Sequence, residues 1–183
     1  AFYLSAKQHN RAIALLKKAQ ENSPPTSELM MALGSALCEK KNYPEAEKIL
    51  KIALSRFPEE PDIYLALGEV YRSQHRYKEA LKLFNKTLEI DPDFPEGYLS
   101  IGAVYYELGL FKKAEKAHKK GLRLAPYSED LRNAIGEDYW ALKKIKKAIK
   151  EFETALSLNP RFEDSHIDLG NLYLSQKRFD KAR

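Results

Sequence analysis

Long apolar runs, clustered cysteines and a bias toward disorder-promoting residues are all missing from this chain of 183 residues. No segment approaches the roughly 18 to 20 consecutive apolar residues of a membrane-spanning helix, so we expect no transmembrane segment. Cys38 is the only cysteine, which excludes an internal disulfide and leaves the compartment open, with the cytoplasm favoured. With 44% apolar and 31% charged residues, the composition is that of a folded domain.

Constellations of catalytic or metal-binding residues are also missing. The four histidines are never paired at metal-ligand spacing, and Cys38 has no base near it in the sequence. The glycines do not form a phosphate-binding loop. His75 is interpreted as a turn residue and His118 as a partly buried packing residue. We therefore expect no enzyme activity, no catalytic residue, no metal and no cofactor.

The sequence does contain a strict internal repeat, in which residue types recur at a constant interval along the whole chain. Five of the eight glycines fall on it at equal intervals, at Gly34, Gly68, Gly102, Gly136 and Gly170. A proline precedes each of them at a constant distance, at Pro24, Pro58, Pro92, Pro126 and Pro160. An alanine follows each at a constant distance, at Ala46, Ala80, Ala114, Ala148 and Ala182. Such a series indicates an internal repeat.

Two helices per repeat are predicted by the spacing of the apolar residues. Pro61 and Pro95 suit the first turn of a helix, Ser128 suits an N-cap, and the periodic proline ends each second helix. First helices are predicted at 27–39, 61–73, 95–107, 129–141 and 163–175. Second helices are predicted at 43–56, 77–90, 111–124, 145–158 and from 179 onward.

The repeat pattern resembles that of tetratricopeptide repeat (TPR) proteins. The family's sequence of aromatic, Leu, Gly, Tyr, Ala, Phe, Ala and Pro is met in residues 61–94 by Tyr64, Leu67, Gly68, Tyr71, Ala80, Phe84 and Pro92, with Thr87 in place of the second Ala. His118 replaces the Phe of the motif and Gly121 its second Ala, so we expect the loosest packing there. The resemblance implies an all-α solenoid of stacked antiparallel helix pairs, a right-handed superhelix with the first helices on its concave side.

We expect one solenoid fragment over residues 1–183. It divides into a partial repeat at 1–26, four repeats at 27–60, 61–94, 95–128 and 129–162, and a partial repeat at 163–183. Solenoids usually end in polar capping helices, and neither end of this sequence shows one. Apolar residues near the ends should then lack a covering helix and allow self-association, namely Phe2, Leu4, Leu172 and Phe179.

Charge is distributed unevenly between the two sets of helices. The first-helix windows contain 13 acids against Lys40, Arg72 and Arg132, whereas the second-helix windows contain 21 bases against seven acids. Acids in a first turn complement the helix dipole, which explains part of this pattern. Glu69 and Glu137 lie in the middle of their helices, where the dipole gives no such reason.

The resemblance places ligand contacts on the inner face of the first helices. Transferred to this sequence, the candidate peptide-binding residues are Leu65, Glu69, Arg72, Leu99, Tyr106, Glu107, Asn133, Glu137, Trp140 and Asn171. Tyr106 and Trp140 would be exposed apolar anchors, with the glutamates as charge partners. TPR co-chaperones hold the carboxylates of heat-shock chaperones with cations at such positions. The matching positions here contain no cation in either possible frame, so that activity is not expected.

The hypothesis that follows is a non-enzymatic scaffold that binds a basic or amphipathic protein segment in an acidic, aromatic groove. An alternative is a TPR segment of a larger enzyme, such as a glycosyltransferase or sulfotransferase, that positions substrate. A third possibility is that the lysine-rich second helices attract an anionic membrane or nucleic acid. Few aromatic residues lie among those lysines, so specific nucleic-acid recognition is not expected.

Overall fold

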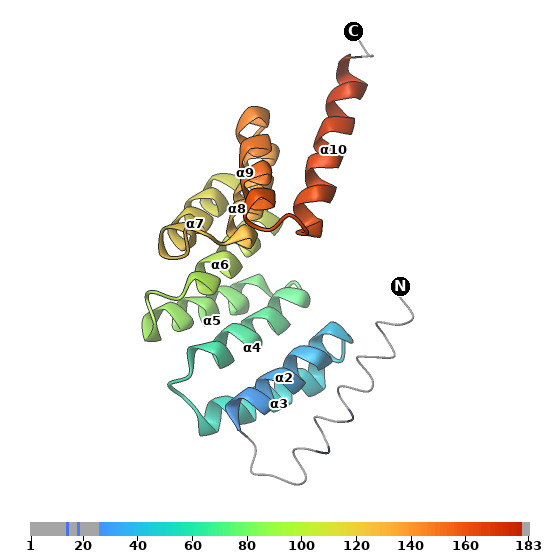
Figure 1. The fold of residues 1–183 in the computed structure, drawn as a ribbon. Helices are drawn as coiled ribbons and strands as arrows, with labels where there is room; N and C mark the ends of the chain where they lie inside the picture. The colour runs from blue at the N-terminus through green and yellow to red at the C-terminus, as the bar shows by residue number, and fades with distance from the viewer. Residues whose placement is uncertain (1–13, 15–17, 19–25, 181–183) are drawn as a thin grey trace. The chain divides into compact units, whose positions relative to one another are not determined.

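The computed structural model describes residues 14, 18 and 26–180, and nine α-helices and no strand occur in that part of the chain. It divides into two compact units, 1–92 and 93–183, each considered by itself. The N-terminal unit contains α2 (Ser27–Glu39), α3 (Tyr43–Arg56), α4 (Pro61–Ser73) and α5 (Tyr77–Ile90) (Figure 1). The C-terminal unit contains α6 (Pro95–Glu107), α7 (Phe111–Leu124), α8 (Glu129–Ala141), α9 (Ile145–Leu158) and α10 (Glu163–Asp180).

The predicted helix boundaries agree with the structure from residue 27 to residue 158. The all-α fold of paired helices is therefore confirmed. At the C-terminal end the prediction is wrong, because α10 runs without a break from Glu163 to Asp180 where a turn and a second helix were expected. The expectations for Phe2 and Leu4 concern residues outside the described part, as does the side chain of Phe179.

The turns between first and second helices explain why α10 differs. Each turn has one residue in the left-handed region, at the same repeat position: Lys41, His75, Gly109 and Lys143, with φ of 60°, 59°, 71° and 59°. A left-handed conformation is costly for a residue with a Cβ, so tertiary packing has to compensate. The next equivalent position is Lys177, and no second helix packs there in the described residues. Helical geometry therefore continues.

The periodic glycines allow the two helices of a pair to approach closely. A Cβ built on Gly68 would lie 2.4 Å from the ring of Phe84, and one on Gly136 would lie 2.5 Å from the ring of Phe152. In both pairs the large side chain follows the glycine at the same distance along the sequence. Any larger residue at these positions would collide with the neighbouring helix.

His118 occupies the place of that large side chain in the α6–α7 pair. The expectation of loose packing there is wrong, because His118 is only 2% exposed and its ring lies where a Cβ on Gly102 would be. Gly121 is also tightly packed, since an added Cβ would meet Leu131 at 3.0 Å and the carbonyl oxygen of Pro95 at 3.1 Å.

The core of the C-terminal unit includes a cluster of five buried residues: Ile135, Tyr139, Ala148, Phe152 and Leu172. Leu172 is fully buried, so the expectation that it lacks a covering helix is wrong. On α10 the exposed apolar residues are instead Ile167, Tyr173 and Leu174. Self-association through the ends stays a prediction.

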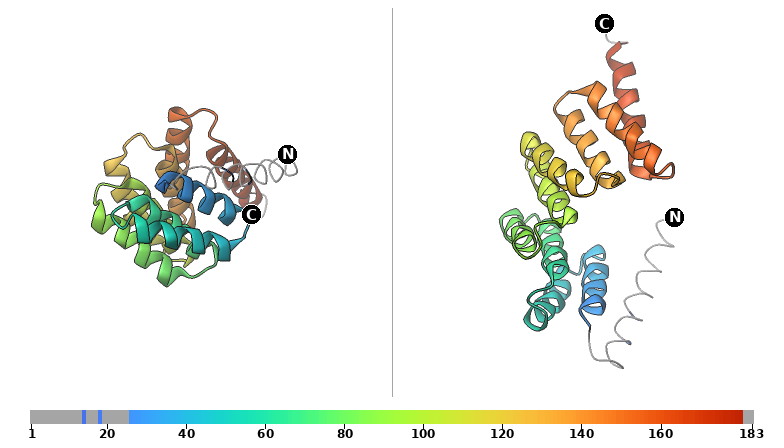
Figure 2. Two further views of the ribbon diagram at one scale, coloured as in Figure 1. Left: turned by 90° about the horizontal axis from the view of Figure 1, so that it is seen from below. Right: turned by 60° about the vertical axis from the view of Figure 1, so that its left-hand side comes forward.

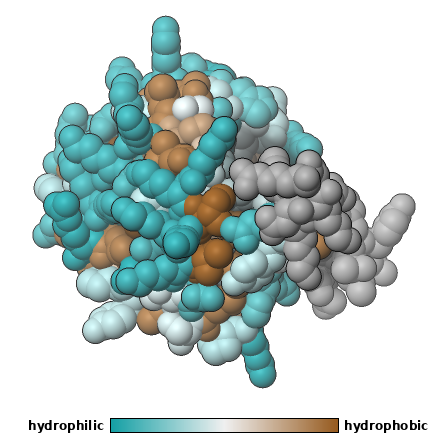
Figure 3. Space-filling view, turned by 90° about the horizontal axis from the view of Figure 1, so that it is seen from above, coloured by the Kyte–Doolittle hydropathy of each residue, from teal (hydrophilic) through white to brown (hydrophobic). Residues whose placement is uncertain are grey.

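The face drawn in Figure 3 shows small apolar patches separated by hydrophilic side chains. In the described part of the chain, no helix is long and apolar enough to cross a membrane.

Candidate functional site

The first helices of the C-terminal unit, α6, α8 and α10, carry most of the predicted binding residues. α8 contacts both α6 and α10, so the three helices form one surface within the unit (Figures 1 and 2). We call this surface the first-helix face.

Asn133 anchors a polar network between α8 and α10. Its amide nitrogen Nδ2 donates to Oδ2 of Asp168 at 3.0 Å, and its Oδ1 accepts a hydrogen bond from the Ser165 hydroxyl at 2.6 Å. Asn133 is 7% exposed and Ser165 is fully buried. Because both hydrogen bonds hold the amide in place, Asn133 positions Asp168 rather than being free to contact a ligand.

Glu137 lies one helical turn beyond Asn133 on α8 and has an unusual electrostatic environment. Burial raises its pKa to about 7, and the charges of Asp168, Asp138 and Asp164 add to the effect. Burial also raises the pKa of Asp168, with Asp164 contributing in the same direction. Glu137, Asp168 and Asp164 therefore form an acidic centre on the first-helix face.

No base whose side chain the structure describes is paired with this acidic centre. α6 contains no lysine or arginine. Arg132, the one base of α8, donates from Nη1 to Glu151 of α9 at 2.9 Å and from Nη2 to the carbonyl of Pro126 at 3.4 Å. Glu137 has neither an ion-pair partner nor a hydrogen-bond partner among the described residues.

The two predicted aromatic anchors are both partly buried. Tyr106 packs edge-on against Phe111, with ring centroids 5.3 Å apart. Burial raises the pKa of the Tyr106 hydroxyl, and the charge of Glu137 adds a smaller effect in the same direction. Trp140 packs against the core cluster of the C-terminal unit. The expectation that Trp140 is a free anchor therefore needs correction, because its ring also supports the fold.

The other predicted residues are distributed over both units. Leu99 is half-buried on α6, while Glu107 at the end of α6 and Asn171 on α10 are exposed. Leu65, Glu69 and Arg72 all lie on α4 of the N-terminal unit. Nη2 of Arg72 lies 2.7 Å from Oε2 of Glu69, so this glutamate is already paired within its own helix.

Ser165 was missed by the sequence analysis, although a signal was present. It stands at the repeat position filled by Ile63, Gly97 and Leu131, and Asn133 stands where Leu65 and Leu99 occur. A polar residue at a repeat position that is elsewhere apolar is such a signal, because burying it requires a partner.

A second buried polar pair joins α7 to α8. Nδ1 of His118 donates to Oδ2 of Asp138 at 2.6 Å, and both side chains are almost fully buried. His118 Nε2 and Asp138 Oδ1 have no hydrogen-bond partner in the described part of the chain. This pair lies in the interior, so we interpret it as structural.

Metal binding has no structural support in the part that is described, where no group of three His, Cys, Asp or Glu side chains could hold an ion. His75 lies in a turn, as predicted, with Nδ1 2.8 Å from the hydroxyl of Tyr77.

Solved structures with the same fold include several TPR proteins. A thermophilic TPR protein of Thermus thermophilus is 22% identical, with a TM-score of 0.85 and 94% of each chain covered. The first TPR of Spaghetti (RPAP3), bound to the HSP90 peptide SRMEEVD, is 23% identical, with a TM-score of 0.59 over 64% of this chain and 93% of that one. MamA from Desulfovibrio magneticus RS-1 is 20% identical, with a TM-score of 0.66 over 85% and 88%.

Sequence comparison points the same way. No curated protein matches the chain. Profiles described as TPR repeat match residues 68–109 and 136–177, and profiles described as tetratricopeptide repeat match residues 3–70 and 95–128. Together these matches cover most of the sequence. They agree with the repeat period and the paired helices described above. The chain belongs to the tetratricopeptide repeat family.

Proposed function

We propose that the chain is a protein-interaction scaffold whose first-helix face binds a basic segment of a partner protein. The observation that carries this proposal is the uncompensated acidic centre around Glu137. Its raised pKa means that ionising this carboxyl in the free protein is unfavourable. A lysine or arginine side chain placed beside it would reverse that penalty, because an opposite charge stabilises the ionised form.

The family relationship supports the scaffold function, and the peptide-bound neighbour supports a segment of protein as the ligand. The peptide in that neighbour, SRMEEVD, contains three acidic residues. Our proposal assigns the opposite charge to the ligand of this chain, because the first-helix face presents carboxylates and α6 presents no base.

Binding of a fluorescein-labelled arginine-rich peptide, followed by fluorescence anisotropy, tests the proposal. Glu137→Gln combined with Asp168→Asn keeps the size of both side chains and removes their charges. We expect about tenfold weaker binding, since hydrogen bonds to charged groups contribute about 1.5 to 3 kcal/mol and partial exposure reduces this. Glu153→Gln is the control, because Glu153 is exposed on the second helix α9.

The pH dependence provides an independent test. Affinity for the arginine-rich peptide should rise as the pH increases through 7, because Glu137 then becomes ionised. Equal binding by the double variant and the wild type, or an affinity that stays constant as the pH passes through 7 and Glu137 titrates, would contradict the proposal.

A further inference from the structure

Helix α7 carries far more positive charge than any other second helix that the structure describes in full. It contains six bases and one acid, a net charge of +5. The equivalent helices α3, α5 and α9 each contain three bases and two acids, a net charge of +1. A net charge of +1 is what the other second helices have, and a solvent-exposed helix face is enough to explain it. The excess is specific to α7.

The excess arises at identifiable repeat positions. Lys113 stands one full repeat after Glu79, and Arg123 stands one full repeat after Glu89. On α5, Glu79 pairs with Arg76, and Glu89 accepts from Lys86 at 3.1 Å. On α7 these acidic partners have been replaced by further bases. The repeat itself therefore gives no reason for the additional charge.

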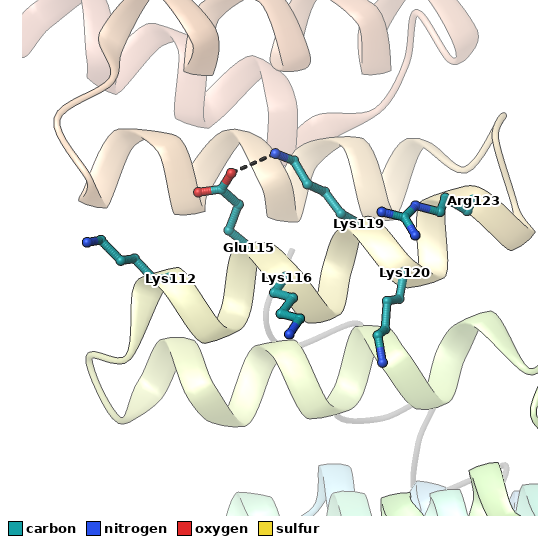
Figure 4. Close-up of a pocket in the computed structure, with 6 residues that line it drawn as sticks. All are labelled: Lys112, Glu115, Lys116, Lys119, Lys120 and Arg123. Atoms are coloured by element: carbon teal, nitrogen blue, oxygen red, sulfur yellow. Dashed lines mark hydrogen bonds and ion pairs between the residues drawn. The ribbon is translucent and has the colours of Figure 1, made fainter.

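Five of the six bases of α7 line a hollow of about 340 Å³ (Figure 4). All six residues that line it are charged: Lys112, Glu115, Lys116, Lys119, Lys120 and Arg123. Glu115 already forms two ion pairs. Its carboxylate oxygens lie 2.6 Å from Nζ of Lys119 and 3.1 Å from Nζ of Lys144. Lys112, Lys116, Lys120 and Arg123 have no acidic partner among the described residues. These four cations form the basic stripe.

The basic stripe has the geometry of a linear docking surface. Its residues are spaced by four, four and three along one helix, which corresponds to a length of about 16 Å with a cation roughly every 5 to 6 Å. A helical partner with acidic residues at the same spacing would match it residue by residue. An extended acidic segment, with side chains on one face about 6.6 Å apart, would match it nearly as well.

Two other anionic partners fit less well. Single-stranded nucleic acid is usually held by exposed aromatic rings, but the nearby rings of Tyr98, Tyr105 and Tyr139 are each covered by a lysine ammonium group at 5.1 to 5.7 Å. A membrane surface is usually engaged by apolar side chains beside the basic ones, and the hollow has none among its lining residues.

We propose that the basic stripe of α7 is a second docking surface, which binds an acidic segment of a protein. It lies on a second helix and is therefore separate from the first-helix face of α6, α8 and α10. The proposal does not depend on the basic ligand assigned above. A chain with both surfaces would bring together two partners of opposite charge.

The test measures anisotropy of a labelled alanine peptide with glutamate at every fourth position, using the full chain. Lys113→Glu with Arg123→Glu restores the residues that α5 has at the same repeat positions. This variant should bind at least about tenfold more weakly, because it lowers the net charge of α7 from +5 to +1, the value of the other second helices. The matched control is Lys78→Glu with Lys82→Glu on α5, which changes the net charge equally and should leave binding within about twofold.

Circular dichroism checks that each variant is folded. Lys112→Gln with Lys116→Gln provides a milder variant, which should also weaken peptide binding. Two further ligands then identify the class of partner. Labelled oligothymidylate and vesicles of phosphatidylcholine with phosphatidylserine are compared with the peptide at the same salt concentration. The proposal is overturned if the α5 control loses binding equally, if the milder variant binds normally, or if the oligonucleotide or the vesicles bind more tightly than the peptide.

Discussion

His118 and Asp138 form a buried hydrogen bond of 2.6 Å at two positions that are apolar in the neighbouring repeats. Phe84 and Phe152 occupy the position of His118, and Val104 occupies that of Asp138. A buried polar pair often contributes less stability than a well-packed apolar pair, yet breaking it by removing one partner is strongly destabilising.

A double-mutant cycle on this pair should therefore be far from additive. His118→Phe alone leaves the Asp138 carboxylate buried without its donor and should cost about 3 to 5 kcal/mol of unfolding free energy. Combined with Asp138→Val it should be neutral or stabilising by about 1 to 4 kcal/mol. Urea denaturation of the two single variants and the double variant measures this. Additive losses would show that the histidine ring is not held by Asp138.

Glu137 should make the stability of the C-terminal unit fall as the pH rises. Its pKa is about 7 in the folded protein and near the ordinary value of 4.5 in the unfolded chain, so the folded state binds the proton more tightly. Stability is therefore highest below the unfolded pKa and is lost as the pH increases through 4.5 to 7. Thermal unfolding of Glu137→Gln should show a smaller loss over this range, and an identical loss would contradict the assignment.

Trp140→Ala should destabilise the C-terminal unit as well as weaken peptide binding. Full truncation of a buried aromatic costs about 3 to 5 kcal/mol, and because Trp140 is only partly buried we expect about 2 kcal/mol. Leu174→Ala on α10 is a suitable comparison, since Leu174 is 63% exposed and should change stability little. Denaturation followed by circular dichroism gives both values. Unchanged stability of Trp140→Ala would restore the interpretation of Trp140 as a free anchor.

Alanine substitutions at two periodic glycines should have opposite effects. Gly68→Ala places a methyl group 2.4 Å from the Phe84 ring and should cost about 1 to 3 kcal/mol through overpacking. Gly170→Ala meets nothing within 4 Å and should stabilise α10 by about 0.5 to 1 kcal/mol, because alanine favours helix more than glycine does. Melting temperatures in opposite directions would confirm the roles of the two positions, and a shift in the same direction would not.

The helices were predictable because residue type recurs with the period of the fold. Gly68 and Phe84 specify a close helix pair by their size, and Pro61 and Pro95 mark where helices begin, so local rules and packing agree. The helical continuation of α10 was not predictable in the same way. The periodic sequence continues beyond residue 177, but a left-handed turn there needs a second helix to stabilise it.

The acidic centre was only partly predictable. Glu137 was visible as an acid in the middle of a helix, but its raised pKa depends on the burial and the neighbouring carboxylates that folding brings to it. The partners of Asn133 are Ser165 and Asp168, which lie on the first helix of the next repeat. Trp140 showed its aromatic character in the sequence but not its contact with the core, because both faces of a first helix contact other helices.

The left-handed turns have a consequence for the order in which the chain folds. Gly109 adopts this conformation without a steric penalty, whereas the equivalent residues Lys41, His75 and Lys143 have a Cβ that opposes it. The α6–α7 turn therefore forms at a smaller steric cost than the other three described turns. In an array whose contacts are mainly between neighbouring helices, the easiest hairpin is a natural nucleus from which structure propagates. The unusual pair His118 and Asp138 would then connect that nucleus to the next helix to form, α8.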